Sequence, residues 1–367
     1  MAFKILNVVG ARPNFMKIAP IMREMKKRGR FFKPVLVHTG QHYDFEMNRI
    51  FFDELSIPKP NYFLNVGSST QSVQTALIME RFEKVLLKEK PDLVLVVGDV
   101  NSTLACALVA AKEHYPVAHV EAGLRSGDWL MPEEVNRVLT DRLSKFLFTT
   151  SLDANENLRR EGITKGVFFT GNTMIDSLKL FEKQAVKTKI QSKLGLKEKG
   201  YCLATLHRQE NVDEKRNLEK LVRMLSTASR FSKVVFPIHP RTMKNLRKTG
   251  LAGKLGKAGV LLTKPLGYLE FLNLEAKAKF VLTDSGGVQE ETTVLGVPCF
   301  TARQNTERPV TVLEGTNTIV GLDSRLFERE LKKLYSGGGK KGRIPKKWDG
   351  RAAERICRIL QREGVMR

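Results

Sequence analysis

The sequence predicts an α/β protein built from two Rossmann-like, doubly wound domains. Three observations lead to this prediction. Short apolar, β-branched runs alternate with longer helix-compatible stretches along the 367 residues. The run LVLVV at 93–97 is continuously apolar, which is typical of a strand buried on both faces of a parallel sheet. A charged stretch with few apolar residues at 183–199 interrupts the alternation, so the first domain is expected over residues 1–182 and the second over 183–349.

The first domain begins with a strand, after which Phe15, Ile18, Met22 and Met25 mark one face of a helix that stops at Gly29. Its strands are expected at Ile5–Val9, Pro34–His38, Asp92–Val97, Pro116–Val120, Phe146–Thr149 and Val167–Thr170. Its further helices are expected at about Phe45–Leu55, Gln71–Lys88, Thr103–Ala111 and Pro132–Leu143, the last with proline at its start.

The second domain repeats the same alternation. Strands are expected at Tyr201–Leu206, Val234–Ile238, Val260–Thr263, Phe280–Thr283 and Pro298–Thr301, and helices near Leu218–Arg230, Met243–Leu255, Leu269–Ala278 and Arg325–Tyr335. The glycine-rich segment Ser336–Gly342 predicts a flexible linker. A last helix, Ala352–Arg362, follows it, and we expect the terminal segment 350–367 to pack back on the first domain.

The composition and the motifs that are absent disfavour several classes of function. The net charge of +23 invites a nucleic-acid hypothesis. However, the basic residues are spread over several helices, and no aromatic-interleaved basic motif or zinc-finger spacing occurs. We therefore expect solvated basic faces that attract anionic substrates, and no nucleic-acid partner. The sequence has no G-x-G-x-x-G after its first strand, no Walker P-loop and no H-E-x-x-H, so we expect no cofactor and no metal.

The hydropathy of the sequence and its cysteines indicate a cellular location. No apolar run is long enough to span a membrane, and no basic segment precedes the apolar start of the chain. We expect a cytoplasmic protein with no membrane partner. The four cysteines are far apart in apolar surroundings, which favours buried thiols over disulfides or zinc ligands.

The stretch FVLTDSGGVQEE at 280–291 is the strongest single site candidate. It predicts a strand, a small-residue turn and a helix start. Paired glycines let a ligand approach the backbone, and the free N–H groups of a helix start favour an anion. Ser285 is placed to cap the helix or to donate to a phosphate, and a carboxylate at 290 or 291 to accept ribose hydroxyls. The alternative interpretation is an ordinary capped turn.

Polar residues follow other predicted strands as well. In open α/β sheets, ligands bind at the carboxyl ends of strands. Here these ends carry Gly10–Pro13, Gly98–Asp99, Glu121–Arg125, His207–Asn211, His239–Arg241 and Asp284–Gly287. Since both halves show the pattern, we expect the two carboxyl edges to face a central cleft.

Each candidate also has a purely structural interpretation. Asp99 is also placed to cap the helix near Asn101, and Glu121 to pair with Arg125, although an unpaired carboxylate at the end of a buried strand is costly. Glu133 and Glu134 lie in a helix first turn, where acids are favoured by the dipole. His207 lies in HRQEN, which is too polar for a core position. Arg12 and Lys17 lie by a helix start, a poor place for cations unless an anion lies between them.

Nine segments carry a family resemblance. They are GARPNFMKIAP (Gly10–Pro20), TGQHYD (Thr39–Asp44), GDVNST (Gly98–Thr103), HVEAGLRS (His119–Ser126), MPEEVNR (Met131–Arg137), TGNTMID (Thr170–Asp176), LHRQEN (Leu206–Asn211), LTDSGGVQEE (Leu282–Glu291) and NTERP (Asn305–Pro309). In this order, over nearly the whole chain, they resemble the non-hydrolysing UDP-N-acetylglucosamine 2-epimerases of archaea and bacteria.

The resemblance implies a GT-B-like fold, like that of nucleotide-sugar glycosyltransferases, and a homodimer. It implies interconversion of UDP-N-acetylglucosamine and UDP-N-acetylmannosamine for surface polysaccharide synthesis, through elimination of UDP to 2-acetamidoglucal and re-addition. The C2 proton is not acidic, so inversion requires a transient oxidation or an elimination. The missing dinucleotide fingerprint disfavours oxidation, and elimination requires a base at C2 and stabilisation of the departing diphosphate.

The resemblance also assigns residues. Asp99, Glu121 and Glu133 are the acid/base candidates, and His207 assists at the glycosidic oxygen or the phosphate. Around the nucleotide it implies Arg12, Lys17 and Arg308 at the diphosphate, Ser285, Gly286 and Gly287 as donors at the helix start, Glu291 at the ribose, and Phe271 with the backbone near Leu266 at uracil.

Some positions depart from the family pattern. Val100 stands where many members have threonine, and Asp128–Trp129 varies a loop beside the active site. Gln41 and His42 match an activator site of some bacterial members, but Asp44 replaces a polar amide there. Three alternatives remain open: a 2-epimerase of a UDP-diacetamido-uronic acid, a UDP-sugar glycosyltransferase, and a basic nucleotide- or nucleic-acid-binding protein without catalysis.

Overall fold

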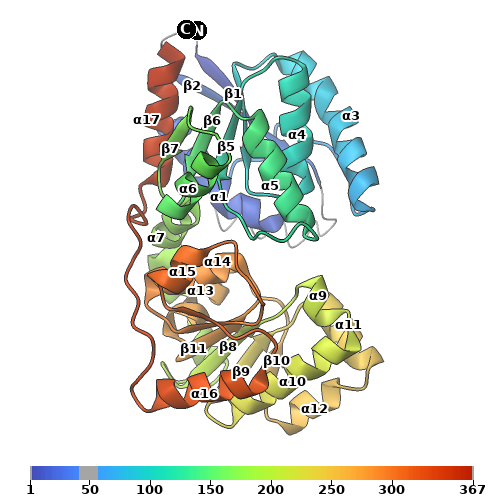
Figure 1. The fold of residues 1–367 in the computed structure, drawn as a ribbon, viewed down its shortest axis with the longest axis vertical. Helices are drawn as coiled ribbons and strands as arrows, with labels where there is room; N and C mark the ends of the chain where they lie inside the picture. Colours follow the sequence, from blue (N-terminus) through green and yellow to red (C-terminus); the bar gives the residue numbers. More distant parts are fainter. Residues whose placement is uncertain (1, 41–56, 366–367) are drawn as a thin grey trace. The chain divides into compact units, whose positions relative to one another are not determined.

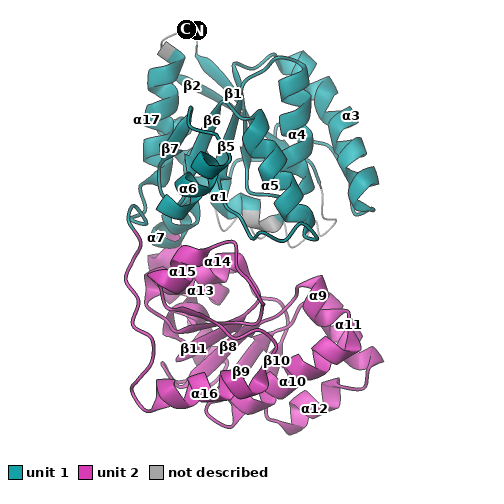
Figure 2. Cartoon of the chain, in the orientation of Figure 1, with its two compact units in different colours: residues 1–180, 346–367 teal, residues 181–345 magenta. Residues whose placement is uncertain are grey.

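The structure is a computed structural model that describes residues 2–40 and 57–365, without the side chains of residues 12, 13 and 365. It divides into unit 1, residues 1–180 and 346–367, and unit 2, residues 181–345 (Figure 2). The predicted helix at 45–55 lies outside the described residues. None of the described helices is both long enough and apolar enough to cross a bilayer.

Unit 1 is built on a parallel sheet with the strand order β3-β2-β1-β4-β5-β6-β7 (Figure 1). Its strands are β1 (Phe3–Val9), β2 (Phe32–His38), β3 (Tyr62–Phe63), β4 (Leu93–Val97), β5 (Val117–Ala122), β6 (Phe146–Thr149) and β7 (Val167–Phe169). Its helices are α1 (Arg12–Lys27), α3 (Gln71–Glu89), α4 (Asn101–Lys112), α5 (Pro132–Leu143), α6 (Leu152–Arg160), most of α7 (Thr173–Val186) and α17 (Ala352–Val365).

The core of unit 1 follows from the apolar strands. All five residues of β4 are buried, as the continuous run LVLVV predicts. The C-terminal segment belongs to this unit: α17 packs on α1, with Arg28 Nη1 donating to Gln361 Oε1 at 3.1 Å. Trp348, 1% exposed, donates its indole N–H to the carbonyl of Thr150 at 2.9 Å.

Unit 2 has a second parallel sheet with the order β10-β9-β8-β11-β12-β13. Its strands are β8 (Tyr201–Thr205), β9 (Lys233–Pro237), β10 (Leu261–Thr263), β11 (Phe280–Thr283), β12 (Cys299–Thr301) and β13 (Asn317–Ile319). Its helices are α8 (Ile190–Lys193), α9 (Gln209–Val212), α10 (Lys215–Ser229), α11 (Pro240–Lys248), α12 (Ala252–Lys257), α13 (Tyr268–Lys277), α14 (Gly286–Leu295), α15 (Pro309–Leu313) and α16 (Ser324–Tyr335).

One predicted element is wrong in its extent. The single helix expected at Met243–Leu255 is two helices, α11 and α12. Gly250 separates them with a φ of +70°, in the left-handed region that ends a helix. The prediction of two parallel-sheet α/β domains is confirmed.

The strand order shows which of the predicted polar loops lie next to each other. In unit 1 the chain reverses its direction across the sheet between β1 and β4, and in unit 2 between β8 and β11. Such reversal points leave an open crevice at the carboxyl ends of the two strands, where α/β proteins bind ligands. The loops that start at Gly10 and Gly98 therefore adjoin in unit 1, and those that start at Leu206 and Asp284 adjoin in unit 2.

Candidate active site

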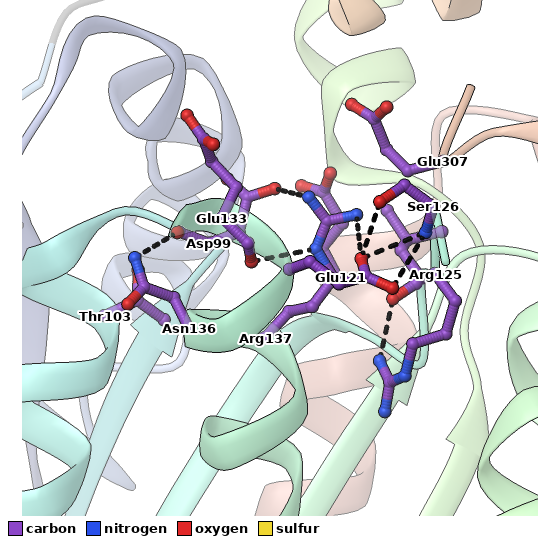
Figure 3. A network of polar contacts seen from close by, with 12 residues as sticks. Asp99, Thr103, Glu121, Arg125, Ser126, Glu133, Asn136, Arg137 and Glu307 are labelled. Atoms are coloured by element: carbon purple, nitrogen blue, oxygen red, sulfur yellow. Dashed lines mark hydrogen bonds and ion pairs between the residues drawn. The ribbon is translucent and has the colours of Figure 1, made fainter. Parts of the chain in front are cut away.

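In unit 1, Asp99 follows β4 and is held from α5. Arg137 Nη2 lies 2.8 Å from Asp99 Oδ2, and Arg137 itself is 1% exposed (Figure 3). The side chain of Asn136 donates to the backbone carbonyl of Asp99 at 2.9 Å. Asp99 is half-buried, with a 21% exposed side chain. The carboxylate is thus oriented by an arginine and remains accessible. It is not the N-cap of α4, whose N-cap residue is Val100 without a side-chain cap hydrogen bond.

Glu121, the penultimate residue of β5, has a strained backbone conformation. The pairing of β5 with β6 shifts register between Val120 and Ala122, so Glu121 lies in a bulge, and its φ is +76°. A left-handed conformation costs a non-glycine residue about 1–2 kcal/mol. Its carboxylate is buried and forms an ion pair with Lys17 of α1. Arg125, the predicted structural partner, pairs with Asp141 at 2.8 Å and Glu161 at 2.7 Å.

The two acids at the start of α5 have different environments. Glu134 is 2% exposed and accepts hydrogen bonds from the backbone N–H groups of Ser126 and Gly127, each at 2.9 Å. It therefore orders the loop at 126–127. Glu133 is half-buried, and its backbone carbonyl accepts from Arg137 Nε at 3.1 Å. Arg137 thus connects the helix turn that carries Glu133 to the carboxylate of Asp99.

In unit 2, DSGG forms the start of α14. Ser285 is the N-cap residue, and α14 begins at Gly286, so the predicted strand, turn and helix are present. Asp284 is fully buried and accepts from the backbone N–H groups of His207 and Arg208, each at 3.0 Å, and from Asn211 Nδ2 at 3.1 Å. The aspartate therefore holds the loop of HRQEN against the DSGG turn.

Arg308 lies against the same helix start. Its Nη1 would be only 2.4 Å from a Cβ placed on Gly286, so the arginine occupies the space that the glycine leaves. Its Nε donates to Glu290 at 2.7 Å and its Nη1 to Glu307 at 2.5 Å. Glu307 also accepts from Arg303 at 2.7 Å. The N-terminus of α14 therefore faces a guanidinium that two buried carboxylates, Glu290 and Glu307, hold in place.

Glu291 lies one residue further along, among other acids. Its Oε1 accepts from the Tyr268 hydroxyl at 3.0 Å, and it is 3% exposed. Burial raises the pKa of Glu291, and the pKa of the fully buried Glu275 on α13 is raised by burial and by Glu291. The two neighbouring acids therefore have different partners: Glu290 accepts from Arg308, and Glu291 accepts from Tyr268.

The remaining predicted residues are spread over both units. His207 is exposed, and its Nδ1 lies 3.3 Å from Asp284 Oδ1. Leu266 and Phe271 are half-buried and pack on the apolar cluster under β8 and β11. Arg12 is described only as the first residue of α1, and Gln41 and His42 lie outside the described residues. Within the described ranges, no group of three or more His, Cys, Asp or Glu side chains is arranged to hold a metal.

Three residues of the site are not among the sequence-predicted candidates. Arg137, which orients Asp99, lies within MPEEVNR, and its three- and four-residue spacing from Glu133 and Glu134 is the signal that places it on the same side of the helix. Asp284 precedes the predicted donors of the DSGG turn, and its role as an acceptor depends on contacts with the loop at 207–211. Glu275 has no signal in the sequence, because its position on α13 resembles that of other helical acids.

The fold is GT-B-like: one Rossmann-like domain presents the helix start at DSGG, and the other presents Asp99 oriented by Arg137 and Glu121 paired with Lys17. A family model described as UDP-N-acetylglucosamine 2-epimerase matches residues 23–361. The chain belongs to the UDP-N-acetylglucosamine 2-epimerase family.

Individual relatives agree with this. The chain is 50% identical over 336 residues to a UDP-N-acetylglucosamine 2-epimerase homolog of Methanococcus maripaludis, covering 90% of this chain and 92% of that protein. A crystal structure of Methanocaldococcus jannaschii UDP-GlcNAc 2-epimerase in complex with UDP-GlcNAc and UDP has a TM-score of 0.91 at 44% identity, covering 98% of this chain and all of that one. A Pseudomonas aeruginosa UDP-2,3-diacetamido-2,3-dideoxy-D-glucuronate 2-epimerase is 40% identical, covering 93% of this chain and 98% of that protein. The predicted resemblance is confirmed.

Proposed function

We propose that this chain interconverts UDP-N-acetylglucosamine and UDP-N-acetylmannosamine. The observation that carries the proposal is the pair of carboxylates at neighbouring strand ends, Asp99 oriented by Arg137 and Glu121 paired with Lys17. Family membership and the relatives described above support the substrate. A protein that only bound nucleotides would gain nothing from such acids, because they repel a diphosphate.

The proposed reaction has two stages. A carboxylate removes the proton from C2, the C1–oxygen bond breaks, and UDP leaves with the electron pair, so that 2-acetamidoglucal forms. The glycal then takes a proton on the opposite face of C2 while UDP adds again at C1. Asp99, Glu121 and Glu133 are the proposed acid/base groups, because general acid–base catalysis requires positioned groups of this kind. His207 would assist at the glycosidic oxygen or the phosphate.

UDP binding is assigned to the second domain, 183–349, and acid/base chemistry to the first, 1–182. The diphosphate would be stabilised by the hydroxyl of Ser285, by the N–H groups of Gly286 and Gly287, and by the side chains of Arg308, Arg12 and Lys17. The N–H of Ser285 itself donates to the Thr283 hydroxyl at 2.9 Å. Glu291 would accept the ribose hydroxyls. Phe271 and the backbone near Leu266 would contact uracil. A homodimer is also proposed, from the family resemblance, and light scattering after gel filtration measures the oligomeric state. A cytoplasmic location is proposed as well, in keeping with the described helices, none of which could cross a bilayer.

The function is tested by incubating the protein with UDP-N-acetylglucosamine in deuterated water and recording proton NMR spectra. We expect a UDP-N-acetylmannosamine product and deuterium at C2 of both sugars. A folded sample that binds UDP but yields neither exchange nor product would contradict the proposal. Running UDP-2,3-diacetamido-2,3-dideoxy-D-glucuronate in parallel decides between the two sugar classes.

A further inference from the structure

His119 is a fully buried histidine on β5, two residues before Glu121, and it contacts the residue directly before Asp99. Its Nδ1 lies 2.7 Å from Asp141 Oδ1, and its Nε2 lies 2.7 Å from the backbone carbonyl oxygen of Gly98. Both ring nitrogens therefore face oxygen atoms, one from α5 and one from the loop after β4. A neutral imidazole has one donor and one acceptor nitrogen, so one of these two contacts requires an additional proton.

The partners decide where the protons lie. A backbone carbonyl can only accept, so Nε2 must donate to Gly98. Asp141 accepts from the backbone N–H of Gly123 at 3.1 Å and pairs with Arg125 Nη1 at 2.8 Å, both through Oδ2. A carboxylate that accepts from a guanidinium and a peptide N–H is favoured in its ionised form. Ionised Asp141 can only accept from Nδ1, so both ring nitrogens of His119 donate.

These contacts surround the strained residue. Asp141 bonds to His119, two residues before Glu121, and to Gly123, two residues after it. Strained backbone conformations persist only where the surroundings over-determine them. The same ring reaches Gly98, the residue directly before Asp99. One buried aspartate–histidine pair is therefore tied to the backbone on both sides of Glu121 and directly before Asp99.

We propose that His119 is a doubly protonated positioning residue, which with Asp141 holds the backbones of Asp99 and Glu121 in their reactive geometry. This inference rests on the proposed function, since it assumes that these two carboxylates act on substrate. The competing interpretation is a neutral core histidine with a protonated Asp141. That arrangement places the proton of a carboxylic acid beside the guanidinium of Arg125, which disfavours it.

The protonation is tested without any variant. Neutron diffraction from crystals of the perdeuterated full-length protein shows deuterons directly. We expect deuterons on both ring nitrogens of His119 and none on Asp141. A single deuteron on the ring overturns the proposal, and this result does not depend on whether the substrate has been identified correctly.

The positioning role is tested by kinetics of D141N and H119Q. The amide introduced by D141N can donate to a neutral ring, and the amide introduced by H119Q places a donor near the former Nε2 position. Each variant therefore removes the charged pair while retaining one contact. Since a misplacement of about 1 Å costs about 100-fold in rate, we expect kcat about 100-fold lower with KM and UDP affinity within about twofold. The matched control is H114N, at an exposed histidine of the same unit whose φ of +62° suits asparagine.

The outcomes are separable. Full kcat in D141N and H119Q overturns the positioning role, and so does a loss of UDP affinity as large as the loss of kcat, because that indicates general destabilisation. If the wild type turns over neither sugar but has both deuterons on His119, the proposed function is wrong. The doubly protonated state of His119 is then still supported. If one variant does not fold, the other supplies the kinetic test.

Discussion

Glu121 has two features that destabilise the folded state, a strained backbone and a buried charge. Its backbone is in the left-handed region at φ +76°, and its carboxylate is buried with Lys17. A buried ion pair contributes little net stability, because desolvation offsets the attraction. Residues that retain both costs are typical of functional sites, where strain is held by the surrounding structure. The geometry therefore separates Glu121 from the many acids of this chain that lie on solvated helix faces.

Replacing Glu121 by glutamine removes the negative charge but keeps an oxygen for Lys17 to bond. Since general acid–base groups contribute about 100- to 10,000-fold, we expect kcat and C2 deuterium exchange to fall within or beyond that range. UDP affinity, measured by calorimetry, should change less than about threefold. E83Q, at an exposed carboxylate of the same unit, serves as the control and should behave as wild type. Loss of UDP binding in E121Q would instead assign Glu121 a structural role.

The absence of a Cβ at Gly286 leaves the space that the Arg308 guanidinium occupies at the proposed nucleotide site. An alanine there would place Cβ 2.4 Å from Arg308 Nη1 and 2.8 Å from its Cζ, so the guanidinium must move. Because charge-assisted hydrogen bonds are worth about 1.5–3 kcal/mol, we expect G286A to weaken UDP binding by about 10- to 100-fold. Calorimetric titration with UDP measures this.

The control for G286A is G253A, in helix α12 of the same unit. Nothing lies within 4 Å of a Cβ at Gly253, so the alanine should keep wild-type UDP affinity. It should also raise the free energy of unfolding by about 0.5–1 kcal/mol through helix propensity. Equal UDP affinity in G286A and wild type would show that Arg308 does not contact the diphosphate.

At the scale of elements, helix α17 depends on an acid from another helix. Asp176 of α7 accepts from the backbone N–H of Ala352 at 3.0 Å and of Ala353 at 2.7 Å, the first two residues of α17. This satisfies two donors that a helix start leaves open. Burial raises the pKa of Asp176 to about 6, while the two N–H groups act in the opposite direction.

This pKa predicts a pH dependence of stability. Between the unfolded pKa of 3.8 and the folded pKa of about 6, the folded state keeps a proton that the unfolded state releases. The free energy of unfolding should therefore fall as pH rises through this window, by about 1 kcal/mol between pH 5 and pH 7, and level off above it. The D176N variant lacks the group and should not show this fall.

Urea titrations of both proteins at several pH values measure the difference. Trp348, which belongs to the same unit, is the fluorescence reporter in a W129F background, since the chain has two tryptophans. Parallel pH profiles for the wild type and D176N would show that Asp176 has an ordinary pKa in the folded state.

At the scale of the whole molecule, each unit has its own sheet and its own buried cluster. One cluster lies under β4 and α4 in unit 1, and another under β8, β9 and α10 in unit 2. The chain leaves unit 1 after residue 180 and returns to it at residue 346. Trp348, Ile356 and Leu360 are all within 1% of full burial in unit 1, so the returning segment is part of its core.

Truncating Trp348 should therefore affect one unit only. Since Trp→Ala changes in a core cost about 3–5 kcal/mol, we expect W348A to accelerate hydrogen exchange in β1 and β4. Exchange in β8 and β11 should stay as in the wild type, as measured by mass spectrometry. W129A removes the exposed tryptophan of the same unit, 64% exposed, and should leave both sheets unchanged. An equal loss of protection in both sheets would show that the two units unfold together.

Local patterns determined most of the elements. The predicted bounds of β6, β11 and α5 agree with the structure, because apolar runs, small-residue turns and an initial proline are local signals. The short strand β13 was missed since three residues carry no periodicity, and α6 was missed because only Ala154 and Leu158 are buried in it. The break at Gly250 was missed because a glycine in a helical pattern is often tolerated.

The sequence by itself determined the fold class, the family and the strand ends that carry polar residues, because parallel strands bring their carboxyl ends to one edge. Only the tertiary structure showed that Glu133 and Glu134 have different partners, and that the same is true of Glu290 and Glu291. Neighbours in sequence point in different directions, and their partners, Ser126 or Arg308, come from other segments. The same holds for His119: its two contacts come from α5 and from the loop after β4, so its charge follows from long-range geometry that no local pattern records.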